Sequence, residues 1–252
     1  MNETKSTIRE LLVEAEKKYH AQDAFRYKVK GADESGKKAA KIESKSYTQL
    51  KDDSERFSAA LAALGEQGKH IAIIGPTSYL WVVTYFGTVD SGSVAVPLDA
   101  NLPDADLCEL IDRADVTTLV YDEAKAGVAE LAAKQCSALK HIICMGVPEG
   151  IAGAHAMWEL LGAQSAGFDY APKPEQLATI MFTSGTTGKS KGVMLTHRNL
   201  AENATCLDMG LEPGMVIMSV LPIHHAYCLS MDILKGISVG SIICINDSLL
   251  RV

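Results

Sequence analysis

The chain has 252 residues, of which 47% are hydrophobic and 22% are charged, and its formal net charge is −7. This balance is typical of a globular protein, and the length suffices for one large domain or two small ones. A surface dedicated to nucleic acid is usually basic, so the acidic charge argues against this class of ligand. We therefore expect no nucleic-acid partner.

The sequence also lacks the signals of secretion and of a membrane span. Its start, MNETKSTIRE, is polar and charged, so we expect no signal peptide. The uncharged stretches 70–89 and 213–231 are interrupted by GPTS at 75–78 and by Pro222, so neither predicts a membrane span, although peripheral association stays open. Six cysteines without zinc-site spacing suggest reduced core thiols in a cytoplasmic protein: Cys108, Cys136, Cys144, Cys206, Cys228 and Cys244.

The first 65 residues predict a helix, a hairpin and a second helix. Thr7 and Glu10 have the spacing of a capping box before an apolar stripe, so a helix should begin after Thr7. The charged stretch 31–41 predicts a loop between two strands. A helical period from 48 to 64 ends before Gly65, a residue suited to the position after a helix.

From residue 70 onward, short β-rich runs alternate with helical patterns, which is typical of βαβ units around a parallel sheet. Strands are expected at 70–75, 93–98, 117–121, 141–145, 177–183, 216–222 and 241–245. Helices are expected from Ser78, from about residue 104, at 123–135, near 157–161, at 199–207 and between the last two strands. The predicted fold class is therefore α/β with mostly parallel sheets.

The segment from Thr183 to Gly192 is rich in glycine, hydroxyl and lysine residues, and an apolar strand and a helix are expected on its two sides. Glycines let backbone amides approach a ligand closely. Amides and hydroxyls form an anion-binding concavity, and lysines add charge. A flexible linker would have a similar composition, but linkers rarely lie between a buried strand and a helix. We therefore expect a polyphosphate ligand.

A Walker A loop is the nearest alternative for this segment. Gly188, Lys189 and Ser190 match the end of that motif, but its first glycine would fall at Thr183. The spacing therefore disfavours a P-loop kinase.

Residues 182–193, FTSGTTGKSKGV, resemble the phosphate-binding signature of the AMP-forming adenylating enzymes, which include acyl-CoA synthetases, luciferases and adenylation domains. The match departs from the family pattern at Ser190, where proline is usual. Three more segments resemble family motifs in the same order: SYTQL at 46–50, GTVDSGSVAVPLDANLP at 87–103 and LPIHHAY at 221–227. The resemblance implies stacked α/β lobes, one formed by residues 66–213 and a second, incomplete one formed by 1–65 and 214–252.

Such enzymes react a carboxylate with ATP to give an acyl-adenylate and pyrophosphate, and usually pass the acyl group to coenzyme A. Phosphoryl chemistry of this kind depends on charge neutralisation and positioning. The resemblance assigns phosphate binding to Thr183, Ser184, Gly185, Thr186, Thr187, Gly188 and Lys191. It leaves Lys189 open between a phosphate contact and a solvated side chain. It places His225, with His224 and Tyr227, in the acyl and adenylate pocket, although two histidines at a strand end could also be structural.

The substrate expectation follows from the same resemblance. No F-D-x-S segment, which binds an amino group in amino-acid-activating relatives, stands near residues 221–227. The motifs are closest to those of long-chain fatty acyl-CoA synthetases, so we expect a fatty acid as the third substrate besides ATP and coenzyme A.

The family's later motifs would follow Val252: the acid that helps to hold Mg²⁺, the acid that binds ribose and the catalytic lysine. We therefore expect an amino-terminal piece that is inactive alone, holds few Mg²⁺ ligands and self-associates through the apolar strands VIMSV and SIICI, which would be left partly unpaired. The alternative is a non-catalytic nucleotide-binding or assembly module made of this half alone.

Overall fold

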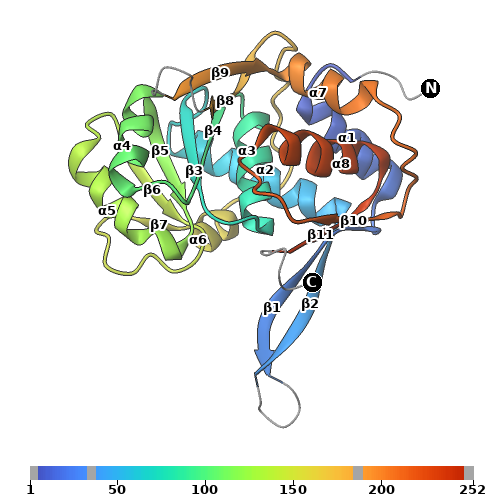
Figure 1. Ribbon diagram of the computed structural model, residues 1–252, viewed down its shortest axis with the longest axis horizontal. Coiled ribbons are helices and arrows are strands. Elements are labelled where there is room, and N and C mark those ends of the chain that lie inside the picture. Colours follow the sequence, from blue (N-terminus) through green and yellow to red (C-terminus); the bar gives the residue numbers. More distant parts are fainter. Residues whose placement is uncertain (1–4, 33–37, 184–189, 247–252) are drawn as a thin grey trace.

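The computed structural model describes residues 5–32, 38–183 and 190–246 (Figure 1). Its helices are α1 (Ile8–Tyr19), α2 (Tyr47–Ala63), α3 (Tyr79–Asp90), α4 (Asp104–Arg113), the 3-10 turn η1 (Glu123–Lys125), α5 (Ala126–Gln135), α6 (Met157–Gly162), α7 (His197–Cys206), the π-helical η2 (Cys228–Leu234) and α8 (Lys235–Val239). Its strands are β1 (Asp23–Ala32), β2 (Lys38–Ser46), β3 (His70–Ile74), β4 (Val94–Leu98), β5 (Val116–Tyr121), β6 (His141–Cys144), β7 (His155–Ala156), β8 (Leu177–Thr183), β9 (Lys191–Thr196), β10 (Val216–Ser219) and β11 (Ile242–Ile245).

The larger sheet has seven strands in the order β7-β6-β5-β3-β4-β8-β9. All neighbours run parallel except β8 and β9. The central strands β3 and β4 are apolar along nearly their whole length and are buried, because helices cover both faces of the sheet. This arrangement confirms the predicted α/β class.

The smaller sheet has four strands in the order β10-β11-β1-β2. β10, β11 and β1 run parallel, whereas β1 and β2 form an antiparallel hairpin that projects away from the body of the molecule (Figure 1). The predicted hairpin is confirmed, but the predicted loop at 31–41 is too long, because β1 continues to Ala32 and β2 begins at Lys38.

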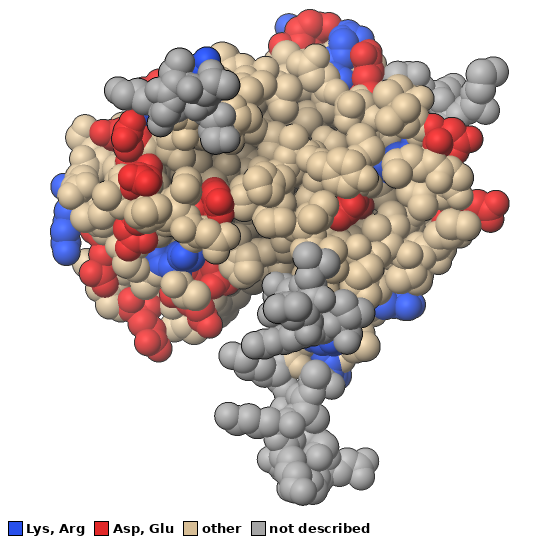
Figure 2. Space-filling model, viewed as in Figure 1, with Lys and Arg blue, Asp and Glu red and all other residues tan. Residues whose placement is uncertain are grey.

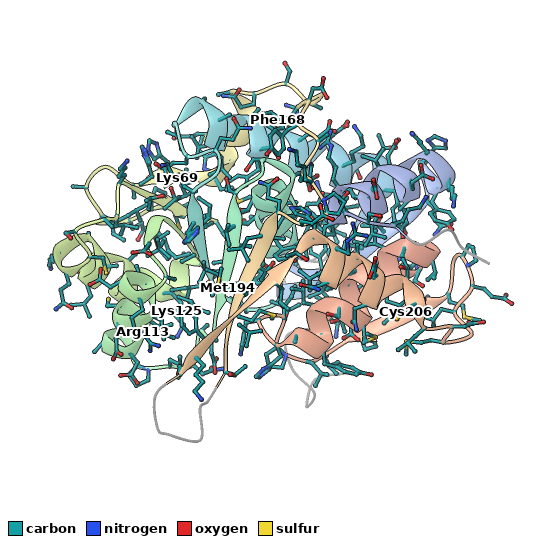
Figure 3. The ribbon with its side chains drawn as sticks, turned by 90° about the horizontal axis from the view of Figure 1, so that it is seen from above. Lys69, Arg113, Lys125, Phe168, Met194 and Cys206 are labelled. Carbon is teal, nitrogen blue, oxygen red and sulfur yellow. The ribbon has the colours of Figure 1, made fainter. Side chains whose placement is uncertain are left out.

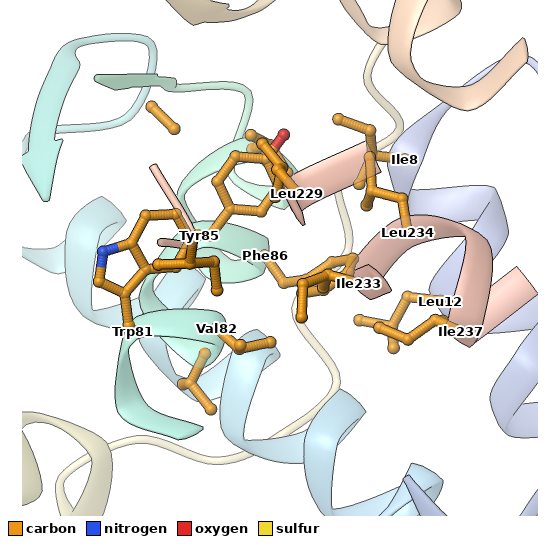
Figure 4. Packing of buried hydrophobic residues seen from close by; sticks show 14 of the residues in the cluster. Ile8, Leu12, Trp81, Val82, Tyr85, Phe86, Leu229, Ile233, Leu234 and Ile237 are labelled. Atoms are coloured by element: carbon orange, nitrogen blue, oxygen red, sulfur yellow. The ribbon is translucent and has the colours of Figure 1, made fainter. Parts of the chain in front are cut away.

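One hydrophobic cluster joins the two sheets. Side chains of α3, such as Trp81 and Phe86, pack with Ile233 of η2, Ile237 of α8 and Leu12 of α1 (Figure 4). A second cluster fills the opposite face of the large sheet, beneath α4 and α5. The proposed lobes, 66–213 and 1–65 with 214–252, stay a prediction, although each sheet draws its strands from one of these two sets.

Most predicted helix ends are confirmed. Thr7 accepts a hydrogen bond from the backbone of Glu10 in a complete capping box. Ser46 caps α2 in the same way with Gln49, and the helix begins at Tyr47, one residue before the predicted start. Gly65 follows α2 at φ 76°, a conformation that glycine adopts without a Cβ clash.

Three expectations are wrong. The glycine-rich segment does not lead into a helix: β9 intervenes and α7 begins only at His197. SIICI is not left unpaired, because β11 pairs with β10 on one side and β1 on the other. Cys206 is exposed, whereas four of the other cysteines are buried; all six thiols are free. In the part of the chain that the structure describes, no helix has the length and apolar character needed to cross a membrane.

Candidate functional site

Three strands of the large sheet end side by side at one edge. β3, β4 and β8 are parallel neighbours, and their carboxyl ends are Ile74, Leu98 and Thr183. The strand order reverses at β3, since β4 lies on one side of it and β5 on the other. Ligands of open α/β sheets bind outside the carboxyl ends of strands at such a reversal. This edge is therefore the candidate site.

The glycine-rich segment arises from this edge as the connection between β8 and β9. Thr183 pairs with Lys191 at the end of the antiparallel ladder, and both side chains are exposed. Most of the predicted phosphate ligands lie outside the described residues: Ser184, Gly185, Thr186, Thr187 and Gly188, together with Lys189. The described site therefore consists of the two flanks of the segment.

The intervening strand changes the expected electrostatics. The six residues of β9 begin at Lys191 and extend about 20 Å at the usual strand rise before the first residue of α7, His197. A helix N-terminus acts on an anion only at close range. The N-terminus of α7 is therefore too far from the flanks to attract an anion there.

Residues 221–227 reach the same edge from the smaller sheet. The hydroxyl of Thr77, in the loop after β3, donates to the carbonyl of Leu221 at 3.4 Å. Nε2 of His224 lies 3.6 Å from Oδ1 of Asp99, the residue directly after β4. Ala95 of β4 lies opposite Thr179 of β8. Four residues further along each parallel strand, Asp99 therefore lies level with Thr183. The structure thus brings the segment 221–227 to the carboxyl edge of the large sheet.

The environment of His224 sets its charge. Burial lowers the pKa of His224, the neighbouring His225 lowers it further, and the Asp99 carboxylate opposes both effects. A neutral imidazole carries one donor and one acceptor nitrogen. His224 at neutral pH is therefore a directional hydrogen-bonding group rather than a fixed cation.

The other two predicted pocket residues lie differently. His225 is exposed, with its ring centroid 4.3 Å from that of His224, and Tyr227 is 59% exposed. The sequence favours His225 as the main pocket residue, whereas the histidine in contact with the β4 loop is His224. The roles of all three stay predictions.

Sequence reasoning missed Asp99 and Thr77. Each follows a predicted strand of the parallel sheet, so the strand pattern alone could have placed it at the carboxyl edge. Asp99 also accepts hydrogen bonds from the backbone and side-chain nitrogens of Asn101, at 2.9 and 3.0 Å, which fixes the turn after β4. Within the described ranges, no group of three His, Cys, Asp or Glu side chains is arranged to hold a metal ion.

Sequence relatives point to one reaction class. Long-chain-fatty-acid–CoA ligase 5 of Mus musculus is 31% identical over 205 residues, a match that covers 72% of this chain and 30% of the relative. Crotonobetaine/carnitine–CoA ligase of Salmonella typhimurium is 28% identical over 204 residues, covering 78% of this chain and 39% of the relative. The chain therefore spans about a third of the length of the curated relatives it matches.

Solved structures and the family profile agree with these relatives. ATP-bound MatB of Rhodopseudomonas palustris superposes with a TM-score of 0.79 at 26% identity, over 97% of this chain and 46% of MatB. The anthranilate CoA ligase AuaEII in complex with anthranoyl-AMP has the same fold, with a TM-score of 0.83 at 17% identity, over 98% of this chain and 45% of AuaEII. The profile of the family described as AMP-binding enzyme matches residues 19–250. This chain belongs to the AMP-binding enzyme family.

Proposed function

We propose that this chain carries the ATP-phosphate-binding part of an AMP-forming acyl-CoA synthetase. In this reaction a carboxylate oxygen attacks the α-phosphorus of ATP and pyrophosphate leaves. The thiol of coenzyme A then attacks the acyl carbon of the adenylate and AMP leaves. The observation that carries the proposal is the meeting of three features at one sheet edge: the flanks Thr183 and Lys191, the turn at Asp99 and the histidine segment 221–227.

The proposed roles follow from the chemistry of phosphate. Hydroxyls and backbone amides donate to phosphate oxygens, and an ammonium group strengthens such contacts by its charge. The hydroxyl donors are Thr183, Ser184, Thr186 and Thr187, the positions of close backbone approach are Gly185 and Gly188, and the cation is Lys191. The exposure of Thr183 and Lys191 supports these roles, because an exposed side chain at the ladder end is free to meet a ligand.

The proposed acyl substrate is a long-chain fatty acid. The name of the mouse relative and the absence of an F-D-x-S segment near residues 221–227 support this choice over an amino acid. His224, His225 and Tyr227 would line the acyl and adenylate pocket, where a neutral His224 can donate to an oxygen without adding charge. We also propose a cytoplasmic location, which the six free thiols support.

Mg²⁺ would accompany ATP and neutralise charge on its phosphates. Asp99 is a carboxylate at this sheet edge, but within the described residues no group of three His, Cys, Asp or Glu side chains could hold a metal ion. On the family resemblance, we propose that the main protein ligands of Mg²⁺ lie outside this chain. The work of residues 1–252 is to bind and orient the phosphates and one wall of the acyl pocket.

Pyrophosphate exchange by the full-length protein tests the reaction and the substrate together. We expect ATP–pyrophosphate exchange with long-chain fatty acids and little with amino acids or short acids. Exchange with amino acids alone would overturn the substrate proposal. The chain of 252 residues, by contrast, should bind ATP in titration calorimetry but give no acyl hydroxamate when hydroxylamine is added as a trap. Hydroxamate formation by this chain would show that the catalytic groups have been assigned wrongly.

A further inference from the structure

One arginine contacts both flanks of the phosphate-binding segment. Arg113 ends α4, next to the start of β9, and its Nη2 donates to the backbone carbonyl of Ser190 at 2.7 Å (Figure 3). Its guanidinium carbon lies 5.7 Å from the ring centroid of Phe182, a distance at which a cation and an aromatic ring attract each other. Phe182 is on β8, before residues 184–189, and Ser190 comes directly after them. No sequence motif includes Arg113.

The ring of Phe182 is held in place from several sides. It packs against the hydrophobic cluster beneath α4 and α5. It also lies beside Gly192 on β9, its partner in the ladder: a Cβ at Gly192 would be 3.4 Å from Cε1 of Phe182 and 3.1 Å from Cγ2 of Ile180. A side chain at residue 192 would therefore crowd the ring that Arg113 contacts.

The guanidinium is itself oriented by its own helix. Nη1 of Arg113 lies 3.6 Å from Oε1 of Glu109, one turn earlier. The last turn of a helix favours a cation, because the carbonyl ends of its peptide dipoles are exposed there. A planar guanidinium can contact a ring and donate to a carbonyl at the same time, whereas a lysine ammonium is a point charge on a flexible stem.

The flanks need such a support. β9 is an edge strand with one neighbour, and residues 191–194 are exposed. Hydrogen bonds at the exposed end of a two-stranded ladder open easily. The contacts of Arg113 tie this end to α4, which packs on the buried face of the sheet.

We propose that Arg113 is a positioning residue for ATP phosphate binding: it holds Phe182 and Ser190 so that the two flanks stay together before the nucleotide arrives. A binding segment whose ends are already fixed loses less conformational freedom on binding. The consequence for ATP rests on the proposed function, whereas the effect on the flanks does not.

The first test needs no nucleotide. Amide hydrogen exchange of residues 181–183 and 191–193 is measured in the chain and in Arg113→Ala and Arg113→Lys. Arg198→Ala is the matched control, since Arg198 is also a half-exposed arginine paired with glutamates, Glu175 and Glu202. We expect exchange at these flanking amides to rise about tenfold in Arg113→Ala, which corresponds to about 1.4 kcal/mol, and not in the control. Unchanged exchange, or a rise throughout β3 and β4, would overturn the proposal.

The second test measures ATP affinity in the same variants. We expect the dissociation constant for ATP to rise three- to tenfold in Arg113→Ala and, despite the kept charge, in Arg113→Lys, in step with amide exchange. Full affinity in Arg113→Lys with raised exchange would assign a charge role and overturn positioning. Raised exchange with unchanged affinity in both variants would also overturn it and leave the proposed function standing. If the unsubstituted chain does not bind ATP, the proposed function and the role toward ATP fail together, while the exchange experiment still decides whether Arg113 holds the flanks.

Discussion

The two sheets use similar apolar strands in opposite surroundings. In the large sheet, every residue of β4, VAVPL, is buried between helices of both hydrophobic clusters. In the small sheet, β10, VIMS, is an edge strand whose Val216 and Met218 are 58% and 49% exposed. The runs look alike in the sequence. The comparison shows that burial of an apolar strand depends on what covers the sheet, which is a property of other parts of the chain.

The exposed hydrophobic residues of the chain are concentrated in the stretch that contains β10. Of the twelve large hydrophobic residues that are exposed in the described part of the chain, seven lie between residues 207 and 227: Leu207, Met209, Met215, Val216, Met218, Leu221 and Tyr227. Acidic side chains gather instead over α4 and α5 at the far end of the large sheet, and the face across α3 and α8 carries few charges (Figure 2). This concentration of exposed apolar residues in one stretch of the chain favours an interaction site there.

The largest expected effect comes from one methionine in each sheet. Met181 on β8 is 5% exposed and Met218 on β10 is 49% exposed. Met181→Ala should lower the free energy of unfolding by about 2–5 kcal/mol, because it removes buried methylenes and leaves a cavity. Met218→Ala should change it by less than about 0.5 kcal/mol. Denaturant unfolding measures both, and similar losses would show that β10 is covered in solution.

The second prediction concerns the pH dependence of stability, which should depend on the buried histidine at the start of α7. His197, the first residue of α7, is fully buried, neither ring nitrogen has a hydrogen-bond partner among the described residues, and burial lowers its pKa to about 4. Between pH 6.5 and about 4 the unfolded chain therefore binds a proton that the folded chain does not. Stability should fall as the pH falls through this window, by at most about 3 kcal/mol from this group.

His197→Leu should remove that slope, and His225→Gln, at an exposed histidine, should not. The difference between variant and wild type is the quantity to compare, because Asp90 acts in the opposite direction: burial raises the pKa of Asp90 to about 7, so its contribution is lost as the pH rises from about 3.8 to 7. An unchanged slope in His197→Leu would mean that water reaches the His197 ring.

The secondary structure of the large sheet was more predictable from the sequence than the surroundings of the small sheet. Except for the two-residue strand β7, which was missed, the strands and helices of the large sheet were predictable from β3 to β8, since apolar runs and caps agree there with the covered sheet. β9 was missed because GVMLT is short and lies beside a helix pattern. The spacing of Thr196 and Asn199, which form a capping box, places the helix start after Thr196 and would have left room for the strand.

The site was predictable where the chemistry is local and not where it depends on packing. The glycine-rich segment and the pair His224–His225 stand out by composition. The burial of His224 against Asp99 depends on a contact between residues 125 positions apart, and the contacts of Arg113 depend on where α4 ends beside β9. Periodicity carries no information about such contacts, because they arise from the arrangement of complete elements.

A smaller effect is expected at the lysines of the phosphate-binding segment. Lys191→Ala should weaken ATP binding by about 1.5–3 kcal/mol, the usual value of a charge-assisted contact. Lys189→Ala should weaken it less, because Lys189 stands at the variable position of the motif. Titration calorimetry with ATP compares the two variants, whose charge is the same. Equal losses would contradict the assignment of Lys191 and would point to a general effect of positive charge.

The smallest expected effect concerns self-association. The test compares the edge strand of the small sheet, β10, with the edge strand of the large sheet, β9. We expect weak dimers of this chain through β10, because an unpaired edge with neighbouring apolar side chains favours pairing with another strand. Met218→Lys should raise the dissociation constant about tenfold, which is about 1.4 kcal/mol. Met194→Lys, at a 66% exposed methionine on the edge strand β9, is the matched control and should have little effect, since seven of the twelve exposed apolar residues in the described part of the chain lie at 207–227, the stretch that contains β10. Light scattering across concentrations measures both variants.

A monomer at every concentration would remove the claim of self-association. A larger effect of Met194→Lys would place the contact at the edge of the large sheet instead.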